Sequence, residues 1–226
     1  MIRYFSVPLA LCLSVLVGCA APGLDKNAKT LDLSKESVAI ISVNMTNEYR
    51  PNYRVNTMMP HFTQGGSTAQ PVIGQGTLED KAEDILVSVK LAPGKYDLSK
   101  LVGVARGFLI NGMLDFSVKS EIEIAPQAVV YLGHVKLVNK ERISKDDQAS
   151  GGALPLIDQA VSGFSGGTMS VSLFDRYEQD VSLFKDSFPV LKGVDIVRSP
   201  IKQMVIRRAY NSNASPITIA MESDKK

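Results

Sequence analysis

The sequence ILVSVKLAPGKYDLSKLVGVA, residues 85–105, decides the fold of this 226-residue chain. Ile85 to Leu91 is short, apolar and rich in β-branched residues, which is typical of a strand. Pro93-Gly94 predicts a turn, because proline presets the backbone and glycine accepts a positive φ. Tyr96 to Ala105 then predicts a second strand. The connection is too short for a crossover helix, which needs about a dozen residues, so we expect the two strands to be antiparallel.

Similar strand patterns, separated by turn signals, lie on both sides of this pair. They cover Ser37–Met45, Phe108–Val118, Ala128–Val138 and Thr168–Phe174, with a short strand near Tyr53–Met58. We expect short closing segments at Val194–Val197, Met204–Arg208 and Pro216–Met221. Asn47 to Gly76 is otherwise expected to be a long loop, because it is rich in proline and glycine. Successive short strands with turns between them predict a mainly β fold, an antiparallel β-sandwich.

One α-helix is predicted in the C-terminal half, near residues 175–188. Asp175, with Glu178 three residues later, fits a capping-box-like start. Pro189 ends the helix, because the residue before a proline avoids helical geometry. One apolar face recurs at helical spacing, at Tyr177, Val181, Phe184 and Phe188.

The N-terminus has the pattern of a secretory signal. Arg3 supplies a positive charge, and Tyr4 to Val17 is almost unbroken apolar sequence. This run is shorter than the roughly 20 residues that a membrane-spanning helix needs, and small residues follow it. We therefore expect a cleaved signal helix at residues 1–18.

The residues Leu16-Val17-Gly18-Cys19 resemble the lipobox of bacterial lipoproteins. The resemblance implies cleavage between Gly18 and Cys19, attachment of diacylglycerol to the Cys19 thiol, and acylation of the new amine by a chain such as palmitate. Two or more chains anchor a protein stably. Because Ala20 rather than Asp follows, the resemblance implies the outer membrane if the cell is Gram-negative, with the protein facing the periplasm or the surface.

This interpretation divides the chain into three parts. Residues 1–18 are the signal peptide, residues 19–36 a polar tether, and residues 37–226 one β-sandwich domain that includes the helix. Cys12 is lost with the signal and Cys19 is blocked by lipid, so the two cysteines of the chain leave no thiol for a disulfide or a metal.

Two sequence blocks carry a second resemblance. Leu91-Ala-Pro-Gly-Lys-Tyr96 and Ile122-Glu-Ile-Ala-Pro-Gln-Ala-Val-Val-Tyr-Leu-Gly-His-Val-Lys-Leu137 are similar to transthyretin-like or carboxypeptidase-regulatory-like domains, which also occur in uncharacterised bacterial lipoproteins. The resemblance covers roughly Ser37 to Val138. It implies a small β-sandwich and no catalytic residues.

The charge balance argues against nucleic acid as a partner. Without Arg3, 24 lysines and arginines stand against 23 aspartates and glutamates, whereas a nucleic-acid-binding domain needs a clearly basic patch. The chain also has no tryptophan, so stacking platforms for carbohydrate are not evident.

No catalytic or metal motif fits its required context. Gly163-Phe164-Ser165-Gly166-Gly167 matches G-x-S-x-G, but a polar loop precedes it and no histidine follows. His61 and His134 are the only histidines, with no zinc-motif spacing around them. We therefore predict no metal, no cofactor and no catalytic residues, although a pair of carboxylates for glycoside hydrolysis stays open.

The candidate binding loop contains Tyr49, Arg50, Tyr53, Arg54 and His61. Tyrosine and arginine are favoured at the centres of interfaces, and loops on a rigid scaffold often carry function. The alternative is that this segment only covers one end of the sandwich.

The sequence thus favours a non-catalytic, lipid-anchored envelope lipoprotein that binds or organises another envelope component, protein or polymer. A hydrolase acting on cell-wall or surface polymer is the alternative from another class. A purely structural domain of a larger surface assembly is the third.

Overall fold

The computed structural model describes residues 23–64, 70–79, 82–106, 111–151, 164–206 and 215–222. Its strands are β1 (Ser37–Asn47), β2 (Arg54–Gln64), β3 (Val72–Ile73), β4 (Gly76–Thr77), β5 (Asp84–Leu91), β6 (Gly94–Arg106), β7 (Asn111–Ile124), β8 (Val129–Glu141), β9 (Gly167–Phe174), β10 (Ile196–Arg198), β11 (Gln203–Ile206) and β12 (Ile217–Glu222). The α-helix α1 (Tyr177–Ser187) and the short 3₁₀ helix η2 (Pro189–Leu191) lie between β9 and β10.

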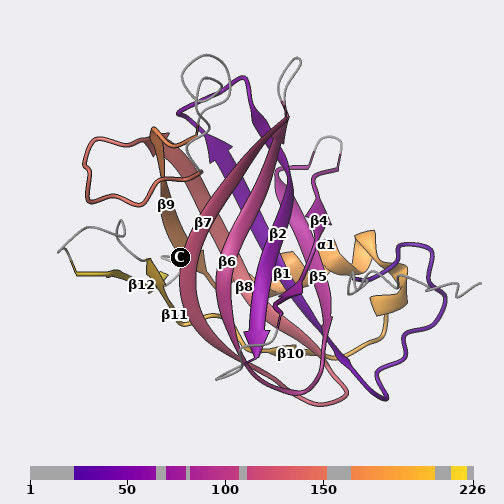
Figure 1. Cartoon of the computed structure of the whole chain (residues 1–226). Helices are drawn as coiled ribbons and strands as arrows, with labels where there is room; N and C mark the ends of the chain where they lie inside the picture. Colours follow the sequence, from indigo (N-terminus) through magenta and orange to yellow (C-terminus); the bar gives the residue numbers. More distant parts are fainter. Residues whose placement is uncertain are drawn as a thin grey trace, which may run out of the picture.

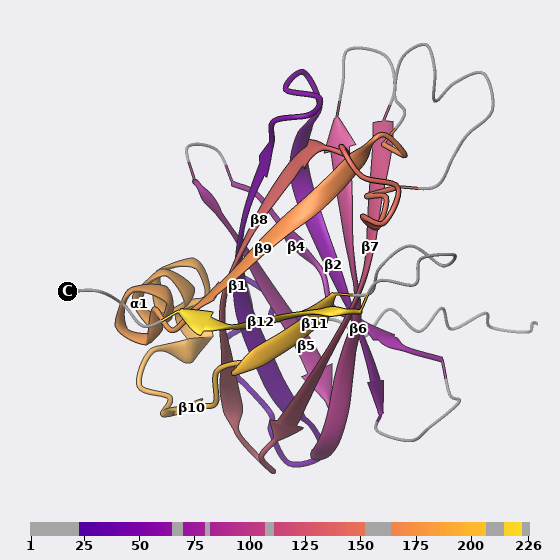
Figure 2. The same ribbon diagram turned by 90° about the vertical axis from the view of Figure 1, so that its left-hand side faces the viewer.

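The strands form one hydrogen-bonded path in the order β3-β2-β6-β7-β11-β12-β9-β8-β1-β5. The path curls into a nearly closed, barrel-like sheet, with α1 outside it (Figures 1 and 2). The short strand β4 brings the two ends together, because it pairs with β2 while the adjacent Gln75 bridges to Ser88 on β5. The mainly β class and the helix near 175–188 are confirmed, but the sandwich of two separate sheets is not.

The expectation of antiparallel pairing throughout is wrong. Strand β8 pairs in parallel with β1 and with β10, and β12 pairs in parallel with β9. The expectation rested on the short connections between strands that are consecutive in sequence. Such strands, for example β6 and β7, do pair antiparallel. The parallel pairs join strands far apart in the chain, where connection length sets no limit.

Two apolar clusters stabilise this arrangement. The larger cluster fills the inside of the curled sheet, with fully buried side chains such as Phe62, Leu98 and Phe116. The smaller cluster lies outside, where Val181 and Phe184 of α1 pack on β1 and β8. A single sheet therefore has covered surfaces on both faces at β1 and β8.

Strand β1 shows this directly. Ala39, Ile41 and Val43 belong to the inner cluster, whereas Val38 and Ile40 belong to the outer cluster. A strand buried on both faces needs apolar residues in succession rather than in alternation, which accounts for the run from 38 to 43.

A bulge in β8 places two residues under the helix. Ile40 of β1 pairs with Tyr131, but Ser42, only two residues later, pairs with His134, so β8 contains one extra residue. Gly133 lies within the bulge at φ 108°, a conformation that favours glycine. The extra residue lets Tyr131 and His134 face the same side of the sheet.

Two expectations about irregular segments differ from the structure. A large part of the expected loop 47–76 forms β2, β3 and β4, because Met58, Pro60 and Phe62 alternate as buried residues along β2. The expected tether contributes Leu24, Leu31 and Leu33 to the outer cluster. Residues 24–33 therefore belong to the folded body.

None of the helices in the described ranges has the length and apolar character that crossing a membrane requires.

Candidate functional site

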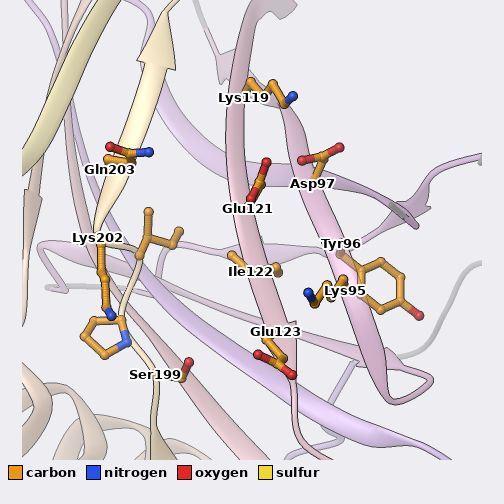
Figure 3. A pocket seen from close by; sticks show the side chains of 12 residues that line it. Lys95, Tyr96, Asp97, Lys119, Glu121, Ile122, Glu123, Ser199, Lys202 and Gln203 are labelled. Carbon is orange, nitrogen blue, oxygen red and sulfur yellow. The ribbon is translucent and has the colours of Figure 1, made fainter. Parts of the chain in front are cut away.

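The sheet carries an open groove beside the lower half of β7. Two adjoining pockets of about 870 and 520 Å³ form it, and both are lined by Glu123 and Ser199. One wall is β7, and the other is the segment from Val197 to Gln203 that joins β10 to β11 (Figure 3).

The groove exists because the sheet splits at this point. Strand β7 pairs with β11 only at Val118 and Lys119, and β10 pairs only with β8. Within the described strands, the edge of β7 from Ser120 to Ile124 therefore has no neighbour on this side. The hydroxyl of Ser120 donates a hydrogen bond of 2.6 Å to the carbonyl of Gln203, which closes the upper end.

The second wall is fixed from behind. The backbone N–H groups of Ser199 and Ile201 donate to the carbonyls of Tyr131 and Leu132 on β8, over 3.0 and 2.8 Å. These bonds hold the segment against β8 and away from β7. The groove is therefore a consequence of the way the strands of the sheet are paired.

The groove is apolar at its base and charged at its rim. Ile122, Tyr96 and Ile201 line it as buried residues of the inner cluster. Glu121 and Glu123 project outward from β7 and are exposed. In the register with β6, Glu121 lies opposite Asp97, and Glu123 lies opposite Lys95.

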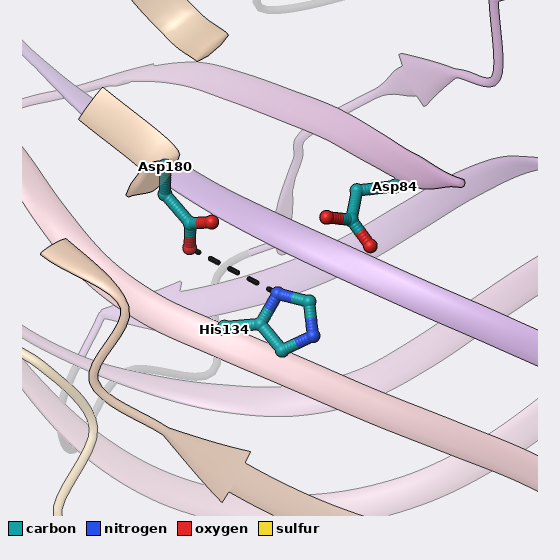
Figure 4. Close-up of side chains that lie close together, drawn as sticks. All are labelled: Asp84, His134 and Asp180. Atoms are coloured by element: carbon teal, nitrogen blue, oxygen red, sulfur yellow. Dashed lines mark ion pairs between the residues drawn. The ribbon is translucent and has the colours of Figure 1, made fainter. Parts of the chain in front are cut away.

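A second polar feature is buried between α1 and the outside of the sheet. Six side chains from α1, its N-cap and strands β1, β5 and β8 meet there: Ser42, Asp84, Tyr131, His134, Arg176 and Asp180. We call them the charge cluster. Figure 4 shows three of them, Asp84, His134 and Asp180, pointing toward one another.

Asp180 is fully buried and connects the helix to two strands. Its Oδ2 accepts a hydrogen bond of 2.8 Å from the hydroxyl of Tyr131 and another from the hydroxyl of Ser42. Oδ1 of Asp180 accepts no hydrogen bond and lies 3.5 Å from Nη2 of Arg176.

Arg176 supplies the positive charge of the cluster. Its Nη2 lies 3.0 Å from Oδ2 of Asp84, and its Nη1 lies 3.1 Å from both ring nitrogens of His134. Since the Ser42 hydroxyl donates to Asp180, Nδ1 of His134, 2.9 Å away, is the donor to Ser42. Nε2 is then left to accept from Arg176, which assigns a neutral histidine with its proton on Nδ1.

The electrostatics agree with this assignment. Burial, aided by Arg176, lowers the pKa of His134 to about 4. Burial raises the pKa of Asp180, although the hydrogen bonds from Ser42 and Tyr131 oppose that change. Burial and the neighbouring Asp180 also raise the pKa of Tyr131.

This cluster does not have the geometry of a serine nucleophile. In a catalytic triad the histidine lies between the serine and the carboxylate, whereas here the Ser42 hydroxyl lies between His134 and Asp180. Ser42 is also fully buried.

Three residues of the charge cluster, Asp84, His134 and Asp180, also offer metal-ligating atoms that lie within 4.8 Å of one another. The guanidinium of Arg176 already lies against all three. It supplies the positive charge that a metal ion would otherwise bring. We conclude that the cluster holds α1 on the sheet.

The predicted binding residues separate in the structure. Tyr53 is buried and meets Phe164 edge to face, with ring centroids 5.9 Å apart. Its ring therefore belongs to the core. Arg50 stacks over the ring of Tyr49 in the turn before β2, with 4.8 Å from its guanidinium carbon to the ring centroid. Arg54 is exposed at the start of β2.

His61 lies further along β2, half-buried and opposite Lys100 in the register. Burial and Lys100 lower its pKa. A binding role for Tyr49, Arg50, Arg54 and His61 stays a prediction.

Several predicted positions lie outside the described residues, namely Gly18, Cys19 and Gly163. Ser165, the central residue of the G-x-S-x-G match, is in the turn before β9, and its carbonyl accepts from Arg142 over 3.3 Å.

The sequence contains a signal for the charge cluster, although no residue of the cluster was predicted to be functional. Asp180 lies four residues before Phe184, on the apolar face of the predicted helix, and His134 is a polar residue in a mainly apolar strand. A charged residue on a buried face requires a partner. His134 is only 3% exposed, and its polar partners are Ser42 and Arg176.

Comparisons with models of protein families, with curated proteins and with solved structures find no match to this chain.

Proposed function

We propose that this protein is a non-catalytic, lipid-anchored lipoprotein of the bacterial envelope that binds another envelope component. The lipobox-like residues Leu16 to Cys19 support the anchor. The groove beside β7 supports the binding role, and it is the observation that carries the proposal.

The groove suits recognition for a physical reason. An unpaired strand edge presents backbone N–H and C=O groups, and proteins normally pair or cover such edges. Here the edge from Ser120 to Ile124 adjoins buried apolar residues and a charged rim. Concave sites with an apolar base and a few polar groups are the usual places for binding.

A hydrolase has no comparable support. Among the described residues, Ser42, His134 and Asp180 are a serine, a histidine and an aspartate linked by hydrogen bonds. Their side chains hold α1 on the sheet. In the described residues, the groove itself is lined by no histidine.

The anchor is tested by Cys19→Ala in bacteria fed a labelled fatty acid. The variant should incorporate no label and should leave the membrane fraction. Cys12→Ala is the matched control, because it removes the other thiol and keeps the lipobox. Label retained in Cys19→Ala contradicts the anchor.

The binding role is tested by a photoreactive amino acid placed at residue 121 on the groove rim. Illumination of living cells should give a discrete crosslinked adduct. The same amino acid at exposed residue 192, beyond η2, is the control and should give none. Absence of an adduct at 121, or equal adducts at both positions, contradicts binding in the groove.

A further inference from the structure

We propose that the occupant of the groove is an extended polypeptide segment that adds to the free edge of β7 as a strand, with a basic residue opposite Glu121. This inference rests on the proposed binding role of the groove and names the chemistry of the partner.

In the described part of the chain, two backbone edges without a paired strand face each other across the groove. The edge of β7 is free from Ser120 to Ile124. Across the groove, the segment 197–201 is bonded to β8 on its far side, so its near side is also without a strand among the described pairings. A single inserted strand would hydrogen-bond to β7 and continue the sheet, which is the mode of recognition called β-augmentation.

The side chains of an added strand would alternate between an apolar and a charged surface. Successive residues of a strand point to opposite faces. Those facing inward would lie over Ile122 and Ile201, which are buried beside the groove, and so should be apolar. Those facing outward would join Glu121 and Glu123 at the rim.

Asp97 and Glu121 place two like charges beside the groove. They lie directly opposite each other on β6 and β7, and like charges in that position destabilise a pair of strands. Among the ion pairs of the described residues, none involves either carboxylate. A lysine or arginine on the added strand would lie next to Glu121, with Asp97 one strand further away. Lys95, Lys119 and Lys202 also line the groove, so the basic residue is assigned to the position opposite Glu121 alone.

The rim charges have a competing explanation, namely that they protect the edge from unwanted strand pairing. That explanation predicts no peptide binding at all. Binding of a peptide of defined sequence distinguishes the two explanations.

The probe is the fluorescein-labelled heptapeptide VTVKVTV, with an amidated C-terminus, added to the full chain in detergent. Valines supply the inward face, and the central lysine supplies the basic residue. Fluorescence anisotropy should show saturable binding. The matched peptide VTVEVTV should bind about fivefold more weakly, because its glutamate would face Glu121, with Asp97 on the strand beyond. Equal binding of the two peptides overturns the charge assignment.

A variant and a modified peptide complete the test. Glu121→Lys should remove or reverse the preference for the lysine peptide, whereas Asp186→Lys, the same change on the exposed side of α1, should leave it unchanged. A peptide with alternate backbone nitrogens methylated keeps its side chains but cannot pair, and it should lose binding.

The outcomes distinguish this inference from the proposed function. If methylated and unmethylated peptides bind equally, or if neither peptide binds while crosslinking at residue 121 persists, strand addition is wrong and the binding role stands. If crosslinking at 121 also fails, the proposed function fails with it.

Discussion

The hydroxyl of Tyr131 on β8 lies 2.8 Å from Oδ2 of Asp180 on α1 and donates a hydrogen bond to it. The same hydroxyl accepts a hydrogen bond of 3.1 Å from the backbone N–H of Arg176, the N-cap residue of α1. No side chain caps this helix, so the expected capping by Asp175 is wrong. Asp175 instead accepts from Arg198 over 2.9 Å. Tyr131 thus satisfies one of the free N–H groups at the helix start.

Asp180→Ala should lower the free energy of unfolding by about 3 kcal/mol, because it leaves buried Tyr131 and Ser42, and partly buried Arg176, without their common partner. Urea denaturation measures the change. Asp186→Ala, an exposed aspartate of the same helix, is the control and should shift stability by less than about 0.5 kcal/mol. Equal effects of the two substitutions would show that the charge cluster does not hold α1.

Protonation of His134 should destabilise the fold in weak acid. The fold lowers the pKa of His134 from 6.5 to about 4, so between these values the unfolded chain binds a proton that the folded chain does not. Stability contributed by His134 is therefore present above pH 6.5 and is lost as the pH falls toward 4, by up to about 3 kcal/mol. Urea denaturation across this range should show a rise in stability with pH.

His134→Gln provides the comparison for that prediction, because glutamine does not titrate. Asp180 acts in the opposite sense, since its raised pKa costs stability as the pH rises above 3.8. Both proteins contain Asp180, along with the neighbouring Asp84, Arg176 and Lys136 of the His134 environment. The difference between their curves therefore isolates His134, and parallel curves between pH 4 and 6.5 would refute its role.

Tyr53 and Arg54 are adjacent but should respond oppositely to substitution. Tyr53→Ala removes a core ring that packs on Phe164 and should cost about 3 kcal/mol. Arg54→Ala removes an exposed side chain and should change stability by less than about 0.5 kcal/mol. Thermal or urea denaturation of both variants checks this. A loss of stability in Arg54→Ala alone would reverse the assignment of core and surface here.

Local patterns predicted most of the elements but not their partners. The Pro93-Gly94 turn and the strands on each side of it follow from short-range chemistry, and β5, β6 and α1 occur where the sequence indicated them. The pairing of β1 with β8 joins residues about ninety positions apart. The hydrophobic periodicity of a single strand does not indicate which distant strand it pairs with. The run of apolar residues in β1 did indicate burial on both faces, and only the sandwich interpretation obscured it.

The groove was not predictable in the same way. Its residues in β7 show the alternation of any strand with one buried face, with Glu121 and Glu123 outward and Ile122 inward. Its existence depends on β11 leaving β7 after Lys119, which is a matter of long-range pairing. The charge cluster was closer to prediction, because Asp180 breaks the apolar face of α1.

Ile40 and Ile41 provide the sharpest test of a sheet covered on both sides. They are neighbours on β1, at 0% and 1% exposure, and belong to the outer and inner clusters respectively. Ile40→Ala and Ile41→Ala should each lower the free energy of unfolding by about 3 kcal/mol, measured by urea denaturation. Ile217→Ala on β12, at 38% exposure, is the control and should cost less than about 1 kcal/mol. In a sheet with one solvated face, only one of two consecutive residues would be costly, so a mild effect of Ile40→Ala would mean that α1 does not cover β1.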